Sequence, residues 1–265
     1  MSLLFDPVVS YVYPSSLNRY TYEDLPDFID YVFITHNHQD HVLFETIFQL
    51  RHKVGTFVVP KGRVGALQDP SLRLILKQVG CGNIVELGEM DMVAIEGGSV
   101  TAVPFFGEHA DLDIQSKSAY LVRHGEKSML FAADSCVFDA HLYSRVREII
   151  GSVDVVFLGM ECDGAPLSWL YGPLLTGKMD RAMDQSRRLA GSDYPQARNL
   201  VSQFAPKEVY VYAMGQEPWL NYIMSIKYSE KSRPIIESNK LIVECIEKKM
   251  VAERLFGEKE IFLDT

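Results

Sequence analysis

Cysteine is scarce in this sequence, and the few that occur are far apart. The chain of 265 residues contains 4 cysteines, namely Cys81, Cys136, Cys162 and Cys245. Because no two of them form a CxxC pair, their spacing argues against a structural zinc knot and against a disulfide scaffold. We therefore expect a protein of a reducing compartment, the cytoplasm, that folds without disulfide bonds.

Positive charge and long apolar runs are also in short supply. The 26 Lys and Arg residues are outnumbered by 35 Asp and Glu, which gives a net charge of -9. Binding to a nucleic-acid backbone or to an anionic membrane needs a concentrated positive field, so we expect neither partner. No apolar segment has the length of a transmembrane helix, and the N-terminal segment lacks the basic region of a signal peptide.

What the sequence does contain is a mixture of short apolar segments and longer amphipathic ones. The apolar segments predict strands at 3–5, 31–34, 56–59, 93–95, 100–106, 119–122, 129–132, 153–158 and 209–212. The amphipathic segments predict helices at 43–52, 70–79, 140–150, 178–189, 196–204 and 234–249, the second of them capped by Asp69. The segment 159–177 is predicted to be a long loop. This pattern is typical of an α/β protein with a single domain, residues 1–265.

The most informative motif is a cluster of histidines directly after the predicted strand 31–34. Three of the 7 histidines of the chain lie in the string His36-Asn37-His38-Gln39-Asp40-His41. Alternate residues of an extended segment point the same way, so His36 and His38 share a side, and the following turn presents Asp40 and His41. A cation relieves the repulsion and desolvation of three crowded imidazoles, so the string predicts a site that can serve two metals. The alternative is a capped turn with incidental histidines.

This string resembles the signature of the metallo-β-lactamase superfamily. Three further segments fall in the order of that family, namely 4–7 (LFDP), 105–111 (FFGEHAD) and 131–135 (FAADS). The resemblance covers nearly the whole chain. It implies an αβ/βα sandwich of two mixed sheets, with the metal site at the sheet edges. It also implies that Asp134 bridges the two metals, whereas its residue type alone is equally typical of a helix cap or turn.

The sequence departs from the family pattern in two places. The family normally opens with two or more strands before the segment that resembles 4–7, so the resemblance implies that the usual first strands are lacking. We expect a dimer mate or a partner segment to cover the strand 3–5. In addition, no histidine follows His141, whereas hydrolases of the family carry a late one on a strand that corresponds here to 209–213. The second metal is therefore expected to lack a nitrogen ligand.

With these departures, the sequence resembles the iron-binding branch of the family. This branch is typified by the diiron β-hydroxylase of chloramphenicol biosynthesis, which acts on an amino acid tethered to a carrier protein. Carried over residue by residue, the resemblance implies a ligand set of His36, His38, Asp40, His41, Glu108 and Asp134. His109 is the rival of Glu108, because ordinary hydrolases use a histidine in this motif. Carboxylates suit iron or manganese and imidazole-rich sites suit zinc, so a glutamate ligand favours iron.

We therefore predict a dinuclear metalloenzyme in which Asp40, Glu108 and Asp134 are the catalytic residues. The favoured hypothesis is a diiron oxygenase that hydroxylates an amino-acid or acyl substrate, either a small molecule or carrier-bound. The first alternative is a zinc or manganese hydrolase of an ester, amide or phosphoester. The second is a non-catalytic domain that keeps the motif for structure or partner binding.

Several other residues have two interpretations. Asp111 and Asp113 either accept hydrogen bonds from metal-bound histidines or are solvated loop carboxylates. Glu161 and Asp163 follow the predicted strand 153–158, where they either contact the site or are ordinary solvated residues. Aromatic residues that either line a substrate pocket or pack in the core are Trp169, Tyr171, Trp219 and Tyr222.

Overall fold

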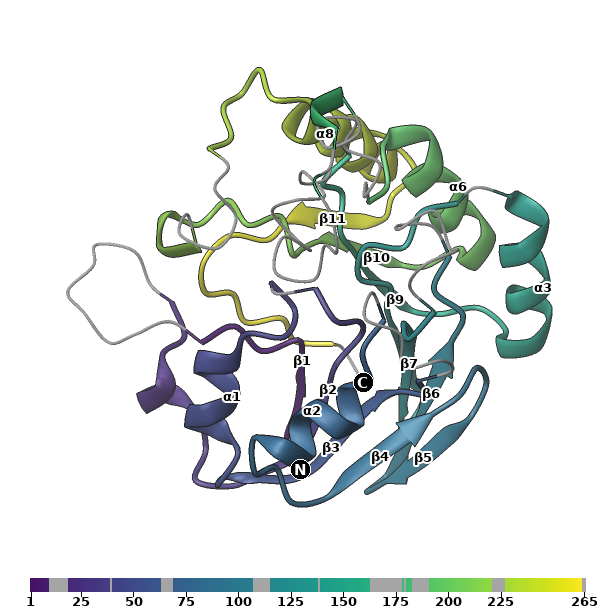
Figure 1. Ribbon diagram of the computed structural model, residues 1–265. Coiled ribbons are helices and arrows are strands. Elements are labelled where there is room, and N and C mark those ends of the chain that lie inside the picture. The colour runs from purple at the N-terminus through teal and green to yellow at the C-terminus, as the bar shows by residue number, and fades with distance from the viewer. Residues whose placement is uncertain are drawn as a thin grey trace.

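The computed structural model describes residues 1–9, 19–38, 40–62, 69–106, 115–137, 139–162, 178, 180–182, 191–220 and 227–263. Two sheets lie against each other at the centre of the molecule, with helices on their outer faces (Figure 1). In spatial order, the first sheet contains β1 (Leu3–Phe5), β2 (Ile29–Phe33), β3 (Val54–Pro60) and β4 (Ile84–Leu87). The second contains β11 (Val251–Arg254), β10 (Glu208–Val211), β9 (Val155–Leu158), β8 (Lys127–Phe131), β7 (Ala119–His124), β6 (Gly98–Val103) and β5 (Met92–Ile95).

The two sheets differ in strand direction. The three pairings of the four-stranded sheet are all parallel. The seven-stranded sheet is mixed, because β5 to β8 pair antiparallel and β8 to β11 pair parallel. Parallel strands place their carboxyl ends at one edge of a sheet, and this edge carries the candidate site.

Helices cover the outer face of each sheet. The four-stranded sheet packs against α1 (Phe44–Leu50) and α2 (Leu72–Gln78), and the seven-stranded sheet against α3 (Ala140–Ile150), α6 (Tyr194–Phe204) and α8 (Arg233–Glu247). Short 3-10 helices are present at η1 (Tyr22–Asp24) and η4 (Pro218–Leu220). None of the helices in the described part of the chain is both long and apolar enough to cross a bilayer.

Alternation along the strands divides the core into three layers. Val32 packs with the helices of its sheet, whereas the next residue, Phe33, packs between the two sheets. In β7, Leu121 likewise packs with the helices on the outer face of its sheet, and Tyr120 packs between the two sheets. Fully burying a side chain such as Phe33 contributes roughly 1.5–3 kcal/mol, so this alternation drives the assembly of the αβ/βα sandwich.

A row of stacked aromatic rings joins the two sheets directly beneath the site. The Phe5 ring lies 4.9 Å from that of Phe33 and 4.0 Å from that of Phe131, and Phe131 lies 4.7 Å from Phe157. Phe5 ends β1 and Phe131 ends β8, so the stack fixes the relative position of the chain segments that follow these strands.

The strands and helices expected from the sequence agree with the structure wherever it describes them, with four differences. β4 and β11 were not expected, because IVEL and VAER are short and mix apolar with charged residues. The expected strand 100–106 ends at Val103, because Pro104 has no N–H for the ladder. The expected Asp69 cap is wrong: Ser71 caps α2, and Asp69 instead accepts the backbone N–H groups of Gln115 and Ser116. Most of the expected helix 178–189 and loop 159–177 lies outside the described residues.

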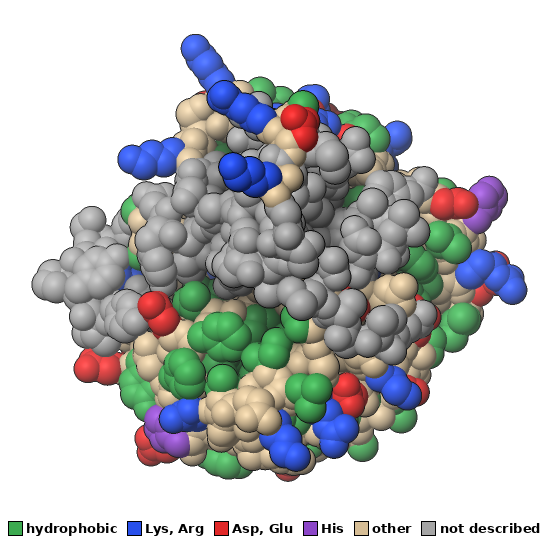
Figure 2. All heavy atoms as spheres, viewed as in Figure 1, with side chains coloured by type: hydrophobic (Ala, Val, Ile, Leu, Met, Phe, Trp, Pro, Cys, Tyr) green, Lys and Arg blue, Asp and Glu red, His purple; other side chains and the backbone are tan. Residues whose placement is uncertain are grey.

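The face viewed in Figure 2 carries exposed hydrophobic side chains. Hydrophobic side chains cluster over the region where Figure 1 places β1, α1 and α2. The two helices contribute exposed Phe44, Phe48 and Leu74 to the surface of the protein.

Candidate metal centre

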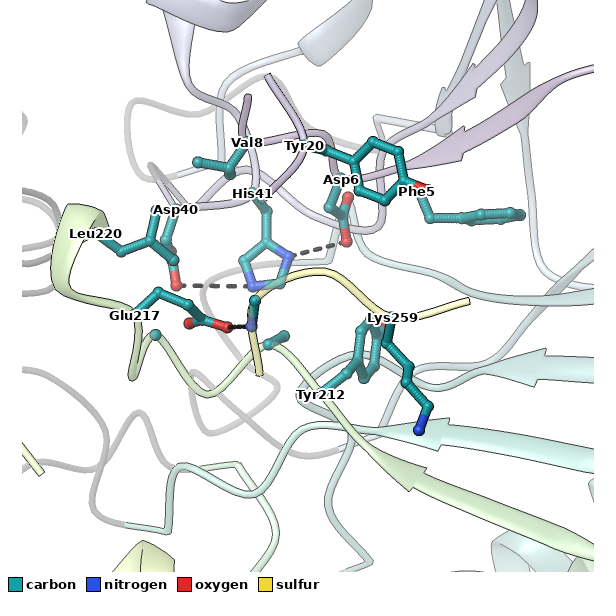
Figure 3. A pocket seen from close by; sticks show the side chains of 13 residues that line it. Phe5, Asp6, Val8, Tyr20, Asp40, His41, Tyr212, Glu217, Leu220 and Lys259 are labelled. Atoms are coloured by element: carbon teal, nitrogen blue, oxygen red, sulfur yellow. Dashed lines mark hydrogen bonds and ion pairs between the residues drawn. The ribbon is translucent and has the colours of Figure 1, made fainter. Parts of the chain in front are cut away.

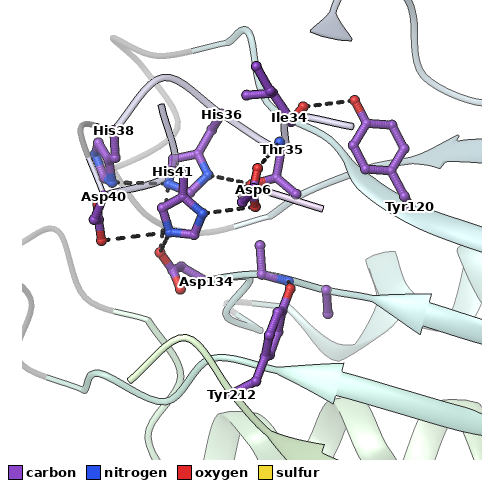
Figure 4. A network of polar contacts seen from close by, with 12 residues as sticks. Asp6, Ile34, Thr35, His36, His38, Asp40, His41, Tyr120, Asp134 and Tyr212 are labelled. Carbon is purple, nitrogen blue, oxygen red and sulfur yellow. Dashed lines mark hydrogen bonds and ion pairs between the residues drawn. The ribbon is translucent and has the colours of Figure 1, made fainter. Parts of the chain in front are cut away.

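The histidine string lies at the carboxyl end of β2, and two aspartates from other strands meet it there (Figure 4). Asp6 follows β1, which neighbours β2 in the four-stranded sheet, and Asp134 follows β8 of the opposite sheet. The candidate centre therefore lies where the strand ends of the two sheets face each other.

The imidazole and carboxylate groups of this cluster are within contact distance. His36 Nε2 lies 3.0 Å from His38 Nδ1 and 3.7 Å from Asp134 Oδ2. His41 Nε2 lies 3.1 Å from Asp134 Oδ2 and 3.7 Å from Asp40 Oδ2. Ligand atoms of His36, His38 and Asp134 all lie within 4.8 Å of one another, which is close enough for one ion to contact all three.

Asp6 orients two of the three imidazoles. Its Oδ2 accepts hydrogen bonds from His41 Nδ1 (2.9 Å) and from the Thr35 hydroxyl (2.6 Å). Because the Thr35 proton is used in this way, His36 Nδ1 must donate to Thr35 Oγ1, 2.9 Å away. Both His36 and His41 are thereby protonated at Nδ1, which leaves Nε2 of each ring directed at Asp134.

Burial and neighbouring charges shift the pKa values of His38 and His41 in opposite directions. Burial lowers the pKa of His38 to about 4, so this ring is neutral and has a lone pair to offer. Burial also opposes charge on His41, but Asp40, Asp134 and Asp6 outweigh it and raise the pKa of His41 well above 6.5. Three carboxylates around one imidazole form a strongly negative environment, which favours bound positive charge.

The backbone around the centre is unusual at the strand ends. Asp6, Ala133 and Ala213 follow β1, β8 and β10, and all have left-handed φ values, of 42°, 47° and 53°. Such conformations cost roughly 1–3 kcal/mol each in non-glycine residues, and they are concentrated at functional sites. Gly159 lies against Asp134, and only glycine fits there, because a Cβ would lie 2.5 Å from Asp134 Oδ1.

A cavity of about 550 Å³ opens beside the centre (Figure 3). Asp40 and His41 form part of its wall, so the candidate metal centre is accessible from this side. The remaining walls come from segments after β1, β10 and β11, including Phe5, Tyr212 and Gly257. A volume of this size is typical of a small-molecule site.

The structure brings together five of the residues that the sequence predicts for the site: His36, His38, Asp40, His41 and Asp134. Residues outside the described part of the chain are Glu108, His109, Asp111, Asp113, Asp163, Trp169, Tyr171 and Tyr222. Glu161 follows β9 and is partly buried, and Trp219 lies in η4 with the Arg19 guanidinium 5.2 Å from its ring.

Sequence reasoning missed two residues at the site. Asp6 belongs to the recognised LFDP segment, and its position directly after a strand was the signal that could have identified it. Tyr212 accepts the N–H of Ala133 at 3.2 Å with its hydroxyl oxygen. Burial, reinforced by Asp6 and Asp134, raises the pKa of Tyr212 well above 10, so its hydroxyl stays protonated beside the centre.

Comparison with known proteins defines the class. The beta-lactamase superfamily domain matches residues 2–167, and the chain belongs to this superfamily. The αβ/βα sandwich expected from the sequence is confirmed by the arrangement of sheets and helices and by the structural matches.

Two similar proteins come from Streptomyces venezuelae. The chain is 49% identical over 256 residues to a 3-hydroxylase of 4-amino-L-phenylalanyl groups on the CmlP peptidyl carrier protein, covering 96% of this chain and 48% of that protein. The crystal structure of CmlA, a diiron beta-hydroxylase, matches with a TM-score of 0.90 and 49% identity, over 96% of this chain and 49% of CmlA. The chain thus spans about half the length of these relatives.

A more distant match shows the fold alone. The isothiocyanate hydrolase from Delia radicum gut bacteria is 13% identical, with a TM-score of 0.58, over 98% of this chain and 92% of the hydrolase.

Proposed function

We propose that this chain is the metal-binding domain, residues 1–265, of an iron-dependent oxygenase that hydroxylates an aminoacyl or acyl substrate held on a carrier protein. One observation carries the proposal. The buried cluster of His36, His38, His41 and Asp134 lies in a chain that is 49% identical over 96% of its length to a diiron beta-hydroxylase.

The residues of the centre fit a dinuclear metal site. Asp134 is buried, and its Oδ1 has no hydrogen-bond partner among the described residues. An unpaired buried carboxylate oxygen is costly, whereas a carboxylate that bridges two ions uses both of its oxygens. His36 Nε2 and His38 Nδ1 lie 3.0 Å apart, and one ion can contact both at the distance of about 2.1 Å typical of imidazole ligands.

His36, His38, Asp40, His41 and Asp134 would hold the two metals, together with Glu108 or His109. The carboxylates of the set favour iron or manganese over zinc, and the similarity to a diiron beta-hydroxylase favours iron. Two irons supply the oxidising power that breaks a C–H bond. The chain itself holds the imidazoles in position through Asp6 and Thr35, and it admits the substrate through the cavity beside His41. Phe5 and Tyr212 form part of the wall of this cavity.

The absence of a late histidine supports the oxygenase over the hydrolase. The segment after β10 enters the cavity wall with Tyr212, Ala213 and Gly215, none of which replaces the nitrogen ligand of a hydrolase. A site with fewer nitrogen ligands would leave room at the metals for a co-substrate.

The carrier-protein partner and the cytoplasmic location are part of the same proposal. The relative acts on a group attached to a peptidyl carrier protein, which supports a carrier-bound substrate for this chain. All four cysteines are free and buried, which supports a reducing compartment.

Metal analysis of protein produced with added iron, combined with an optical spectrum, tests the proposal. We expect about two irons per chain with charge-transfer absorption, and loss of iron in His36→Ala. His141→Ala is the matched control, because His141 lies on the exposed start of α3. Two zinc ions with esterase or phosphodiesterase turnover would instead establish the hydrolase.

A further inference from the structure

The cavity beside His41 contains a carboxylate that the metal centre does not use. Glu217 lies between β10 and η4 and lines the cavity together with Asp40 and His41 (Figure 3). Its Oε1 accepts the backbone N–H of Gly257 at 3.1 Å, which ties it to the segment after β11. No other side-chain interaction engages the Glu217 carboxylate within the described ranges, so Oε2 is available to a ligand.

The other charged groups of the cavity already have partners. Asp6 accepts hydrogen bonds from His41 and Thr35, and Asp40 lies 3.7 Å from His41. Lys259 lines the wall, but its ammonium pairs with Glu253 at 2.9 Å, and both side chains are about half exposed. Asp40 Oδ1 also lacks a hydrogen-bond partner among the described residues, but Asp40 belongs to the set that would hold the metals. Glu217 is therefore the carboxylate of this cavity, outside that set, with an oxygen left for a bound molecule.

The rest of the cavity wall suits an aromatic or aliphatic side chain. Phe5, Val8, Tyr20 and Leu220 supply apolar surface around the polar groups. A pocket that combines apolar surface with an uncommitted carboxylate is complementary to a molecule that carries both an apolar body and a cationic or N–H-donating group.

We propose that Glu217 binds an amino group of the substrate, while the substrate side chain packs against Val8, Tyr20 and Leu220. This inference rests on the proposed function and deepens it, because it restricts the substrate from acyl groups in general to aminoacyl groups. The amino group is either the α-amine or an amine on the side chain, since both donate hydrogen bonds to a carboxylate.

Equilibrium binding of amino-acid amides tests the inference, because an amide resembles the carrier-bound acyl group and lacks a free carboxylate. The probes are 4-amino-L-phenylalaninamide, 3-(4-aminophenyl)propanamide without the α-amine, and L-phenylalaninamide without the ring amine. We expect one of the two probes that lack an amine to bind the unmodified protein about tenfold more weakly than 4-amino-L-phenylalaninamide does, because it loses a charge-assisted hydrogen bond. Which probe loses affinity identifies the amine.

Glu217→Gln is the decisive variant. Glutamine keeps an oxygen to accept the Gly257 N–H, so a merely structural role for Glu217 predicts unchanged binding and an unchanged melting temperature. Under our inference, the difference between the probes falls to less than about twofold in Glu217→Gln. Glu247→Gln is the matched control, because Glu247 is exposed at the end of α8 and does not line the cavity, and it should retain the full difference.

Two outcomes would overturn the inference: equal binding of the three probes by the unmodified protein, or a difference that persists in Glu217→Gln. Metal content, measured on the same samples, tests the proposed function independently of the role of Glu217. Amine selection in a zinc-containing protein would support the role of Glu217 and overturn the oxygenase. Two irons without amine selection would support the oxygenase and overturn the role of Glu217.

Discussion

Asp6 has more influence on the candidate centre than its absence from the predicted ligand set suggests. Through one carboxylate oxygen it contacts His41 directly and reaches His36 by way of the Thr35 hydroxyl. Its other oxygen accepts the Thr35 backbone N–H at 2.7 Å, which fixes the start of the histidine string. Such outer contacts determine which ring nitrogen faces a metal.

Asp6→Asn should weaken metal binding without removing any ligand. Asparagine has one acceptor oxygen in place of two, so it cannot accept both from the Thr35 backbone N–H and from the pair of the Thr35 hydroxyl and His41 Nδ1. The imidazoles therefore lose their common orientation. We expect a loss of about 10- to 100-fold in iron affinity, measured by competition with a chelator. Asp27→Asn, at an exposed position, is the control. Equal affinities in the two variants would contradict the positioning role of Asp6.

Glu108 and His109 decide which metal chemistry the site supports. If Glu108 is a ligand, Glu108→Ala should lose about one of two metal ions and abolish oxygen-dependent turnover, while His109→Ala keeps near-normal metal content. Elemental analysis and product formation measure the two effects. The reverse pattern would indicate a nitrogen-rich, hydrolase-like site and remove the main support for iron.

At the level of elements, the amino ends of β8, β9 and β10 are joined at the edge of the second sheet opposite to the centre. Asp154, directly before β9, accepts from the Ser128 backbone N–H and hydroxyl of β8, at 3.0 and 2.8 Å. It also accepts from the Lys207 ammonium at 2.8 Å, next to the start of β10. One side chain thus joins the amino ends of three neighbouring strands.

Asp154→Asn should destabilise the protein in a pH-dependent way. Lys207, followed by Ser128, outweighs burial and lowers the pKa of Asp154 below 3.8. A lowered folded-state pKa stabilises the fold above the unfolded value and loses this effect as the pH falls through the folded value. We expect a loss of about 1–2 kcal/mol at pH 7 that shrinks below about pH 4, measured by urea denaturation.

The exposed pair of Arg145 and Glu148 provides the comparison for Asp154. Glu148→Gln should cost less than about 0.5 kcal/mol at every pH, because solvent screens exposed ion pairs. A constant loss in Asp154→Asn from neutral to acidic pH would show that packing, rather than charge, explains its role.

For the whole molecule, one open surface is the β1 edge of the four-stranded sheet. In the described part of the chain, β1 and β4 are the two edge strands of this sheet. A hollow of about 650 Å³ lies beside it, lined by Met1, Leu3, Val122 and Met129 among others. Uncovered sheet edges and apolar hollows promote association with other chains.

We expect a second copy of this chain, or an added segment of a longer protein, to cover the edge at β1. Light scattering across a wide concentration range should detect dimers of this chain, and hydrogen exchange should slow at 3–5 as they form. A monodisperse monomer with fast exchange at this strand would contradict the expectation. The relatives are about twice as long, which makes a covering segment the second candidate.

The sequence by itself determined the features that depend on near neighbours. Alternation and apolar runs identified most strands, because burial on one face repeats every second residue. The spacing in His36-Asn37-His38-Gln39-Asp40-His41 brought three imidazoles together within a single loop, as the structure confirms for its described members. The family signature, and with it the sandwich fold, followed from motifs of the same short length.

Only the tertiary structure decided the contacts between distant segments. Asp134 meets His41 across 93 positions of sequence, and Asp6 meets it across 35, because two sheets and an aromatic stack bring their strand ends together. Glu217 reaches the cavity through the segments after β10 and β11, neither of which has a periodic pattern that predicts its path. Local patterns encode which residues are buried, whereas sheet register and packing decide which buried residues meet.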